Sequence, residues 1–225
     1  SDDFPNEPLC NFFTRQPVGT ASQYNLANVN VRFININSQR NEGIDATLSV
    51  AQDLGSLGKL NLLAQMTWQI KDEIEIFGGD IEDNNGEAGD PVWTGKFTAV
   101  WQPSDRFSLA YGLDVIGRTN DEQDYRDLDT EGDLCTTGSV IYGDYCVELI
   151  GENTFYHSLS GKLTWENFEI TAGVSNLFNT RPPRTTITGG NTLNSGAVPT
   201  YGQSVFTSQY DLLGRRYFIN VTARY

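Results

Sequence analysis

The side chains best suited to chemistry lie in long polar stretches of the chain. Asp127, Asp129 and Glu131, followed by Gly132, match the start of a calcium-binding EF-hand loop. The twelfth position of such a loop would be Gly138, where the motif needs a bidentate glutamate, so the EF-hand prediction fails. Carboxylate oxygens are still the ligands that Ca²⁺ prefers. A loose Ca²⁺ site is therefore one interpretation, and a solvated acidic loop is the simpler one.

Catalytic constellations are missing from the sequence. His157 is the single histidine, which excludes a histidine-based triad and a multi-histidine metal site within this chain. Neither a glycine-rich phosphate-binding loop nor a Cys-x-x-Cys pair occurs. We therefore expect no enzymatic activity and no cofactor apart from the weak Ca²⁺ candidate.

The chain has three cysteines, which are too few for a disulfide scaffold. Cys135 and Cys146 lie in one polar stretch, and a surface pair in an oxidising compartment is a candidate disulfide. Cys10 would then be unpaired, or paired with a cysteine outside this sequence.

Four further polar residues are candidates for contacting a small-molecule ligand: Tyr125, Arg126, Arg181 and Arg184. The net charge of -14 makes an anionic ligand bound chiefly by the acidic stretches less favourable, and it argues against nucleic acid as a partner.

The elements that must position these residues are predicted by a repeated alternation of apolar and polar side chains. Between Phe155 and Trp165 one set of alternate residues is largely apolar, and the intervening set is largely polar. Similar alternation occurs near 42–51, 58–76, 93–102, 106–118, 168–177 and 214–225. Because successive side chains of a strand point to opposite faces, we predict an all-β protein.

Aromatic residues at both ends of the apolar face favour a membrane barrel over a soluble sandwich. They form a predicted aromatic girdle of Trp93, Trp101, Phe155 and Trp165. Ten strand steps of about 3.3 Å, tilted by about 40°, rise about 25 Å, which is the height of the apolar band of an outer-membrane barrel. We predict an antiparallel transmembrane β-barrel, although no run of about 18 apolar residues exists.

The connections between the predicted strands alternate in length. Outer-membrane barrels have short periplasmic turns and long extracellular loops. We therefore expect about seven membrane strands within 28–225, long extracellular loops near 77–92, 119–152 and 179–213, and a further extracellular loop in 1–27. We also expect residues 29–37 to extend the earliest strand, with a β-bulge near 39–42.

Single-chain bacterial barrels have even strand numbers, and a sheet of seven strands would also have open edges in lipid. The sequence therefore predicts that further strands, upstream of this chain, complete the barrel.

Several segments resemble the TonB-dependent receptors of Gram-negative outer membranes. The run from Gly173 to Thr180, with Asn176-Leu177-Phe178-Asn179 followed by Pro182-Pro183, is similar to the family's Asn-Leu-Phe strand end. The run from Tyr210 to Phe218 is similar to its final Tyr-Asp-x-x-Gly-Arg segment, and Tyr225 to its terminal aromatic residue. The run from Arg40 to Asp45 resembles a strand start of the family.

The resemblance implies that this chain supplies the last seven strands of a 22-stranded barrel in the cell outer membrane. It implies an N-terminal plug and a box that binds TonB, both outside this sequence. The implied function is energised uptake of an iron chelate such as a siderophore, a vitamin, a sugar or a similar scarce nutrient. In this family the terminal strand is recognised by the barrel assembly machinery, which here concerns Gly214, Tyr217, Phe218 and Tyr225.

The expected partners follow from the same resemblance. They are the TonB complex, a small-molecule ligand, a surface lipoprotein, and outer-membrane lipid with lipopolysaccharide, whose phosphates a bound Ca²⁺ can bridge. Two alternatives stay open at this point. One is a small self-contained porin-like or adhesin-like barrel of eight strands, in which 28–37 and 42–51 are separate strands. The other is a soluble extracellular sandwich.

Overall fold

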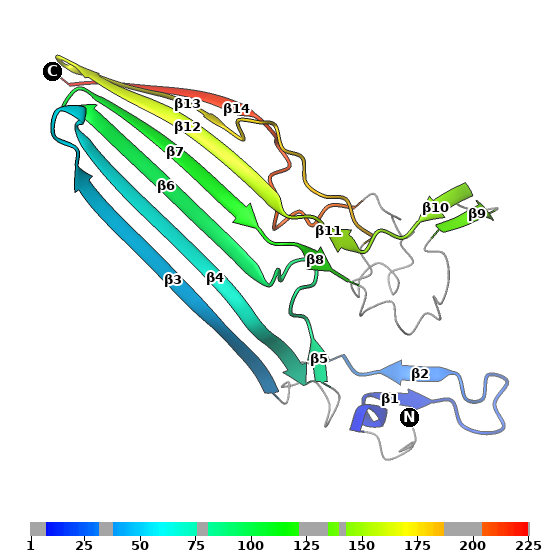
Figure 1. Ribbon diagram of the computed structural model, residues 1–225. Helices are drawn as coiled ribbons and strands as arrows, with labels where there is room; N and C mark the ends of the chain where they lie inside the picture. The colour runs from blue at the N-terminus through cyan, green and yellow to red at the C-terminus, as the bar shows by residue number, and fades with distance from the viewer. Residues whose placement is uncertain are drawn as a thin grey trace.

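A computed structural model describes residues 8–31, 38–75, 81–121, 135–139, 143–186 and 204–224. Its main feature is one long antiparallel sheet (Figure 1). The long strands follow one another in the order β14-β13-β12-β7-β6-β4-β3, and the short strand β5 pairs with β4. Their bounds are β3 (Ser38–Asp53), β4 (Lys59–Glu75), β5 (Ile81–Asp83), β6 (Trp93–Ser104), β7 (Phe107–Ile116), β12 (Thr154–Trp165), β13 (Phe168–Ser175) and β14 (Arg216–Ala223). The predicted all-β antiparallel sheet of about seven long strands is confirmed.

The registers of the strand pairs place the apolar alternate residues of all seven strands on one face. Ala64 of β4 pairs with Phe97 of β6, and Phe97 pairs with Leu113 of β7. The same row continues through His157 of β12, which is opposite Leu113. Side chains alternate between the two faces of a strand. Once one pair of opposed residues is known for two neighbouring strands, it is therefore known which residues of both strands share a face.

This apolar face is not covered by other parts of the described chain. Tyr217 is 73% exposed and Ile219 is 72% exposed, and each long strand has at least one large apolar side chain that is more than one-third exposed. Within the described residues, the buried apolar side chains are only Leu149, Tyr156 and Tyr210. A soluble sandwich buries the facing apolar sides of its two sheets. In the described part of the chain, no second sheet covers the apolar face.

The opposite face carries polar residues that pair across strands. Lys96 and Asp114 are directly opposed and their charged groups are 3.3 Å apart. Lys162 lies 3.0 Å from Glu169, and the Thr67 hydroxyl donates to Asp45 over 2.7 Å. Cross-strand pairs of opposite charge stabilise a sheet modestly. The charges therefore help to hold the strands in register.

One glycine on the polar face makes room for an aromatic ring. Gly173 pairs with Ser160 on one side and Phe218 on the other. A Cβ atom at Gly173 would lie 2.7 Å from the Phe218 ring and 2.8 Å from the Leu159 carbonyl oxygen. A side chain at position 173 would have to displace both the ring and the backbone.

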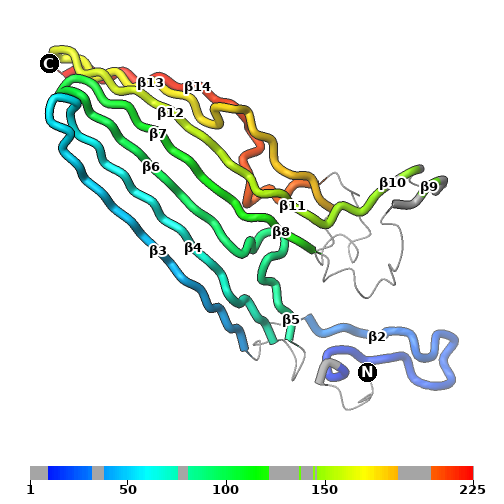
Figure 2. The backbone as a smooth tube through the Cα atoms, viewed as in Figure 1, coloured from blue at the N-terminus to red at the C-terminus, as the bar shows by residue number. Residues whose placement is uncertain are grey.

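The two ends of the sheet differ in their connections. At the turn end, β3–β4, β6–β7 and β12–β13 are joined by short turns, and the C-terminus lies beside them (Figure 2). The first of these turns contains the 3₁₀ helix η2 (Gly55–Leu57). At the opposite loop end the connections are longer. Among the described residues, no helix is long and apolar enough to cross a membrane.

The stretches predicted as long loops contain short strands where they are described. β8 (Thr119–Asn120) pairs with β11 (Ile150–Gly151), and β9 (Cys135–Ser139) pairs with β10 (Gly143–Cys146). Residues of the predicted N-terminal loop form the 3₁₀ helix η1 (Pro8–Phe12), β1 (Phe13–Arg15) and β2 (Leu26–Val29). Backbone groups removed from water need partners, and these short ladders supply them.

The beginning of the first long strand differs from the expectation. Val29 belongs to β2 and pairs with Phe13, so it does not extend β3, which begins at Ser38. A bulge does occur next to the expected place, because Glu42 pairs with Lys71 whereas Gly43 pairs with Gln69. The additional residue is Ile70 of β4. The bulge therefore lies in the partner strand.

Candidate ligand-binding pocket

The pocket begins with a turn that ends β13. Asn176 is only 3% exposed and has a positive φ of 50°. Its side chain closes a ring with Thr180, because its Nδ2 donates to the Thr180 carbonyl oxygen over 2.9 Å and its Oδ1 accepts from the Thr180 amide over 2.7 Å. Asparagine tolerates this backbone conformation and offers both a donor and an acceptor. The Asn-Leu-Phe motif therefore forms a turn that is closed by the side chain of Asn176.

The other residues of this turn attach it to the sheet. The Leu177 amide donates to the His157 carbonyl oxygen over 2.7 Å. The Phe178 ring meets the His157 ring edge-on, with centroids 4.8 Å apart. The Tyr111 hydroxyl lies 2.7 Å from Nδ1 of His157. The single histidine thus belongs to an aromatic cluster on the apolar face and is held at both its ring and its backbone.

The second wall comes from the segment before β14. Tyr210 is 8% exposed, and burial raises the pKa of its hydroxyl. The Asp211 amide donates to the Tyr156 hydroxyl over 3.2 Å, which ties the segment to β12. The Asp211 carboxylate accepts from the Leu213 amide over 3.0 Å and lies 3.1 Å from the Arg216 guanidinium. The Asp211 carboxylate therefore has its partners, Leu213 and Arg216, within its own segment.

The two segments meet at Asn179 and Gly214. Asn179 has a φ of 56° and Gly214 a φ of 70°. The Asn179 Oδ1 accepts from the Arg215 amide over 3.0 Å, and a Cβ at Gly214 would lie 2.8 Å from the same oxygen. Glycine is required here both by the left-handed backbone and by this close approach. The two motifs that resemble receptor sequences are thus parts of one junction.

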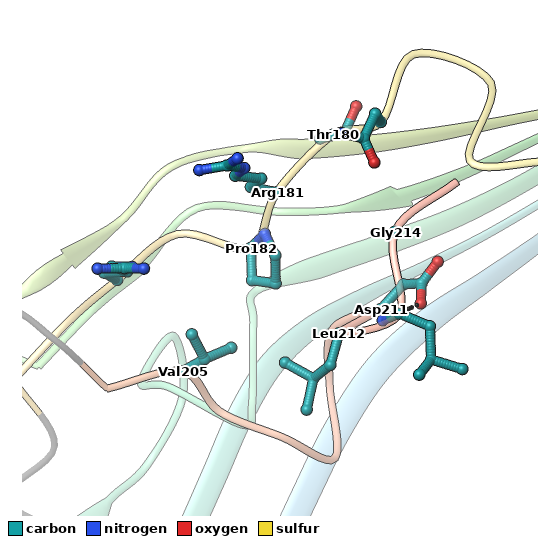
Figure 3. Close-up of a pocket in the computed structure, with 10 residues that line it drawn as sticks. Thr180, Arg181, Pro182, Val205, Asp211, Leu212 and Gly214 are labelled. Carbon is teal, nitrogen blue, oxygen red and sulfur yellow. Dashed lines mark hydrogen bonds between the residues drawn. The ribbon is translucent and has the colours of Figure 1, made fainter. Parts of the chain in front are cut away.

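A hollow of about 340 Å³ lies between these segments (Figure 3). Arg181 and Pro182 approach it from one side and Leu212 and Asp211 from the other. Its full lining is Asn179, Thr180, Arg181, Pro182, Arg184, Val205, Asp211, Leu212, Leu213 and Gly214. The volume falls in the range of small-molecule sites, which combine apolar walls with a few polar groups.

The charge of the pocket is set by its two arginines. Arg181 and Arg184 are both exposed, and within the described part of the chain neither forms an ion pair, whereas Arg216 takes the one lining acid. Two of the four residues predicted to contact a ligand, Arg181 and Arg184, therefore line one cavity. A guanidinium presents a planar set of donors that matches a carboxylate or a phosphate.

A buried acid joins two of the loops at the loop end of the sheet. Asp121 is 4% exposed, its Oδ1 accepts from the Ala88 amide over 2.7 Å, and its own amide donates to the Leu149 carbonyl oxygen. The Gly89 amide donates to Oε1 of Gln209 over 3.2 Å. At least one member of the acidic stretch 119–152 is thus a structural residue, which a composition argument does not identify.

A pair of acids, Asp72 and Asp90, lies where β4 meets the following loop. Asp72 is 8% exposed, and the pKa of Asp90 is raised by burial and by the negative charge of Asp72. No cluster of three or more metal-ligating side chains is found among the described residues. The Ca²⁺ candidates Asp127, Asp129 and Glu131 lie outside the described residues, as do the ligand candidates Tyr125 and Arg126.

The predicted girdle residues lie on the apolar face. Trp93 is directly opposite Trp68 towards the loop end, and Trp165 is opposite Phe168 at the turn end. The Trp101 indole donates to the Leu57 carbonyl oxygen in the β3–β4 turn over 2.8 Å, and Trp165 is 62% exposed. An indole with an apolar body and one donor suits a boundary between lipid and water. Their role as a membrane girdle stays a prediction.

Two of the three cysteines lie opposite each other. The backbone of Cys146 is opposite that of Cys135 in the β9–β10 pair. Cys146 is disulfide-bonded, and Cys10 is free. The Cys135–Cys146 bridge stays a prediction that this register favours.

Tyr217 lies on the apolar face and Phe218 on the polar face of β14. Tyr225 lies outside the described residues.

Three residues of the junction were not predicted from the sequence. Asn179, Asp211 and Tyr156 connect segments that are far apart in the chain. In a sequence, an Asn directly after a strand pattern is a turn signal, because Asn tolerates positive φ. An Asp is another, because its carboxylate can accept from the amide two residues further on. A search for such turns next to predicted strands would have found the first two, but not the partner hydroxyl of Tyr156.

Comparison with known proteins gives one similar solved structure. No family model and no curated protein matches the sequence. A crystal structure of a mutant ferric enterobactin receptor (PfeA) from Pseudomonas aeruginosa is similar with a TM-score of 0.49 and 16% identity, over 84% of this chain and 23% of that chain. This chain spans about a quarter of that receptor's length.

Proposed function

We propose that this chain forms part of the wall and the extracellular end of an outer-membrane β-barrel that imports a scarce nutrient by a TonB-dependent mechanism. The observation that carries the membrane part is the apolar face, which runs across seven strands and is uncovered. Burying such a face in lipid would remove it from water, which is favourable by about 25 cal/mol per Å². The polar face would then line the interior of the barrel.

The ends of this face support the same placement. Trp68 and Trp93 mark it towards the loop end, and Trp165 and Phe168 mark it at the turn end. Aromatic residues are enriched at both membrane interfaces. The turn end would therefore be periplasmic and the loop end, with the arginine pocket, extracellular.

Closure of the barrel requires strands beyond those described here. β3 and β14 are the outermost long strands of the sheet, so each has one edge without a sheet partner among the described residues. Unpaired backbone groups are not tolerated in the hydrocarbon core. We therefore propose that the sheet joins the remaining strands of a larger barrel, which the resemblance of the 173–180 and 210–218 segments puts at 22.

TonB-dependent uptake rests on those two segments, and the nutrient is not specified by the geometry. An iron chelate, a vitamin or a sugar all suit a receptor of this kind. The proposed partners are the TonB complex, through a plug region outside this sequence, together with outer-membrane lipid, a small-molecule ligand and a surface lipoprotein.

The proposal is tested on the native polypeptide extracted from outer membranes. Its intact mass is measured, and the same sample is passed over an immobilised periplasmic domain of TonB. We expect a mass far above 25.0 kDa and retention on TonB that an excess of soluble TonB domain prevents. A membrane protein of 25.0 kDa without TonB binding would favour a small closed barrel, and a polypeptide that needs no detergent would favour a soluble sandwich.

A further inference from the structure

We infer that three loops at the loop end of the sheet form a closed ring that opens as a single unit, and that the arginine pocket opens only with it. The first loop, between β5 and β6, is 84–92. The second joins β7 to β12 and is described at 117–121 and 146–153, and the third joins β13 to β14 and is described at 176–186 and 204–215. These segments are called the loop ring below. The inference goes beyond the proposed transport and rests neither on TonB nor on a membrane placement.

The first loop is bonded to the second at two places. The Ala88 amide donates to Oδ1 of Asp121 over 2.7 Å, and the Asn120 amide donates to the Gly86 carbonyl oxygen over 2.8 Å. Asp121 is also fixed from its other side, because its amide donates to the Leu149 carbonyl oxygen over 3.0 Å. The strands β8 and β11 hold the two described parts of the second loop side by side (Figure 1). A bond to Asp121 therefore attaches the first loop to both parts of the second.

The second loop is bonded to the third by a reciprocal pair of hydrogen bonds. The Thr186 amide donates to the Glu148 carbonyl oxygen over 2.6 Å, and the Glu148 amide donates to Oγ1 of Thr186 over 3.0 Å. The preceding residue, Thr185, pairs with Ser204 through two backbone bonds of 2.9 and 3.1 Å, which joins the two described parts of the third loop. The second loop is thus attached, through this pair, to both parts of the third.

Two contacts lead from the third loop back to the first and close the ring. The Gly89 amide donates to Oε1 of Gln209 over 3.2 Å. A Cβ atom at Gly89 would lie 2.7 Å from the Phe206 ring, so this ring packs directly on the backbone of the first loop. Each of the three loops is therefore bonded to both of the others. Breaking one contact alone cannot release any of them.

The loop ring is shielded from water, in contrast to the apolar face of the sheet. Its most buried side chains are Thr186 with 0% exposure, Thr119 with 2%, Asp121 with 4%, Leu149 with 6% and Tyr210 with 8%. A buried polar group that loses its partner is not compensated by water. Opening one loop would leave such groups behind on the other two, and contacts of this kind open together as cooperative units. We therefore expect one opening equilibrium for the whole ring.

The arginine pocket is attached to the ring at two of its lining residues. Arg184 directly precedes Thr185, and Val205 directly follows Ser204. Separating these two sides of the pocket requires the Thr185–Ser204 pair to break, which is part of the ring. Opening of the pocket is thus coupled to Asp121, although Asp121 does not line it.

The inference is tested by amide hydrogen exchange of the native polypeptide in detergent, read at single residues by mass spectrometry. Asp121→Ala removes the acceptor of the Ala88 amide. Thr186→Val removes the side-chain acceptor of the Glu148 amide and keeps a side chain of similar size. The two variants break the ring at different contacts, so each reports on the part that the other alters.

Asp45→Ala is the control variant. It removes the acceptor of a 2.7 Å hydrogen bond from the Thr67 hydroxyl, on the polar face of the sheet and outside the ring. Slow exchange of the β12 amides verifies that the sheet is folded in each variant. If Asp121→Ala loses this protection, Thr186→Val decides the test, because it creates no large cavity.

We expect each ring variant to accelerate exchange on the far side of the ring. Loss of a buried hydrogen bond shifts an opening equilibrium by roughly tenfold or more. Asp121→Ala should accelerate the Thr185 and Ser204 amides by about this factor, and Thr186→Val should do the same for the Ala88 and Gly89 amides. Asp45→Ala should leave all four amides within about twofold of the wild-type rates.

Independent loops would give a different pattern. If Asp121→Ala accelerates only the amides next to Ala88, or Thr186→Val only those next to Glu148 and Thr186, the loops do not form one unit and the inference is overturned. Equal acceleration of the ring amides in Asp45→Ala would overturn it as well, since the effect would then not be specific to the ring. TonB retention of the wild-type sample tests the proposed function separately, and its result does not alter the exchange pattern that this inference predicts.

Discussion

The sheet and the junction at its loop end are held together by different means. In the sheet, a row such as Ala64, Phe97 and Leu113 depends on the apolar character of each residue and on backbone ladders. In the junction, single side chains bind particular backbone groups, as Asn176 binds Thr180 and Asn179 binds Arg215. The sheet should therefore tolerate substitutions that keep polarity, and the junction should not tolerate even near-isosteric ones.

The largest effect is expected from a charge on the apolar face of the sheet. Leu48 is 63% exposed in the middle of β3, and its neighbour Ser49 points to the polar face. An arginine facing lipid near the bilayer centre costs about 2–4 kcal/mol. Leu48→Arg should lower the free energy of unfolding by about that much in lipid vesicles, as measured by denaturant titration.

Ser49→Arg is the matched control, because it adds the same side chain one residue away on the other face. It should change the free energy of unfolding by less than about 0.5 kcal/mol. Equal destabilisation by both variants would show that the two faces do not have different surroundings, which would contradict the wall interpretation.

A steric change in the sheet is expected to cost less. Gly173→Val would place a Cβ at 2.6 Å from the Ser160 Cβ and 2.8 Å from the Leu159 carbonyl oxygen. Overpacking of this kind costs about 1–3 kcal/mol. At Gly161 the nearest atom to an added Cβ is 3.7 Å away. Gly161→Val should therefore be nearly neutral in the same titration, and a similar loss in both variants would assign the effect to loss of glycine itself.

The junction is tested by Asn176→Ala. The variant removes both bonds to Thr180 and leaves two partly buried backbone groups without a partner, which costs about 1–3 kcal/mol. Because the loss is local, amide exchange of residues 176–184 should accelerate more than that of β12. Asn61→Ala, at an exposed site on the polar face, is the control. Uniform acceleration across the sheet would contradict the separation of the two regions.

The smallest effect is expected from pH at Asp90. Burial, reinforced by the Asp72 charge, raises the pKa of Asp90 above its ordinary value of 3.8. The folded state then holds this proton more tightly than the unfolded state, so the contribution of Asp90 to stability falls as pH rises from about 4 through the raised pKa. Asp90→Asn should flatten this slope slightly in thermal unfolding scans. An unchanged slope would show that Asp90 titrates normally.

The difference between the two regions also explains what the sequence could predict. All seven long strands were recognised because the period of two is a local signal that the sheet uses directly. Val29 was misplaced because the alternation of 29–37 does not show which neighbour a strand pairs with, and a turn returns it to Phe13. Pairing partners are set by tertiary contacts rather than by local propensity.

The pocket was only partly predictable. Arg181 and Arg184 were selected as cations in a loop, and their common cavity became visible only in the fold. Asp211 and Tyr156 are 55 positions apart in sequence and meet through one hydrogen bond. No periodic pattern encodes such a contact, because it depends on how two strand ends lie side by side.

The most direct test of the central claim is a nitroxide scan along β12, from Phe155 to Trp165, in the native protein in lipid vesicles, with Cys10 replaced by serine. Single labels report collisions with oxygen, which dissolves in lipid, and with a water-soluble nickel chelate. We predict that Leu159 and Leu163 favour oxygen, that Ser160 and Lys162 favour nickel, and that the signal alternates with a period of two. Equal nickel access on both faces, or the opposite phase, would contradict a wall between lipid and a polar interior.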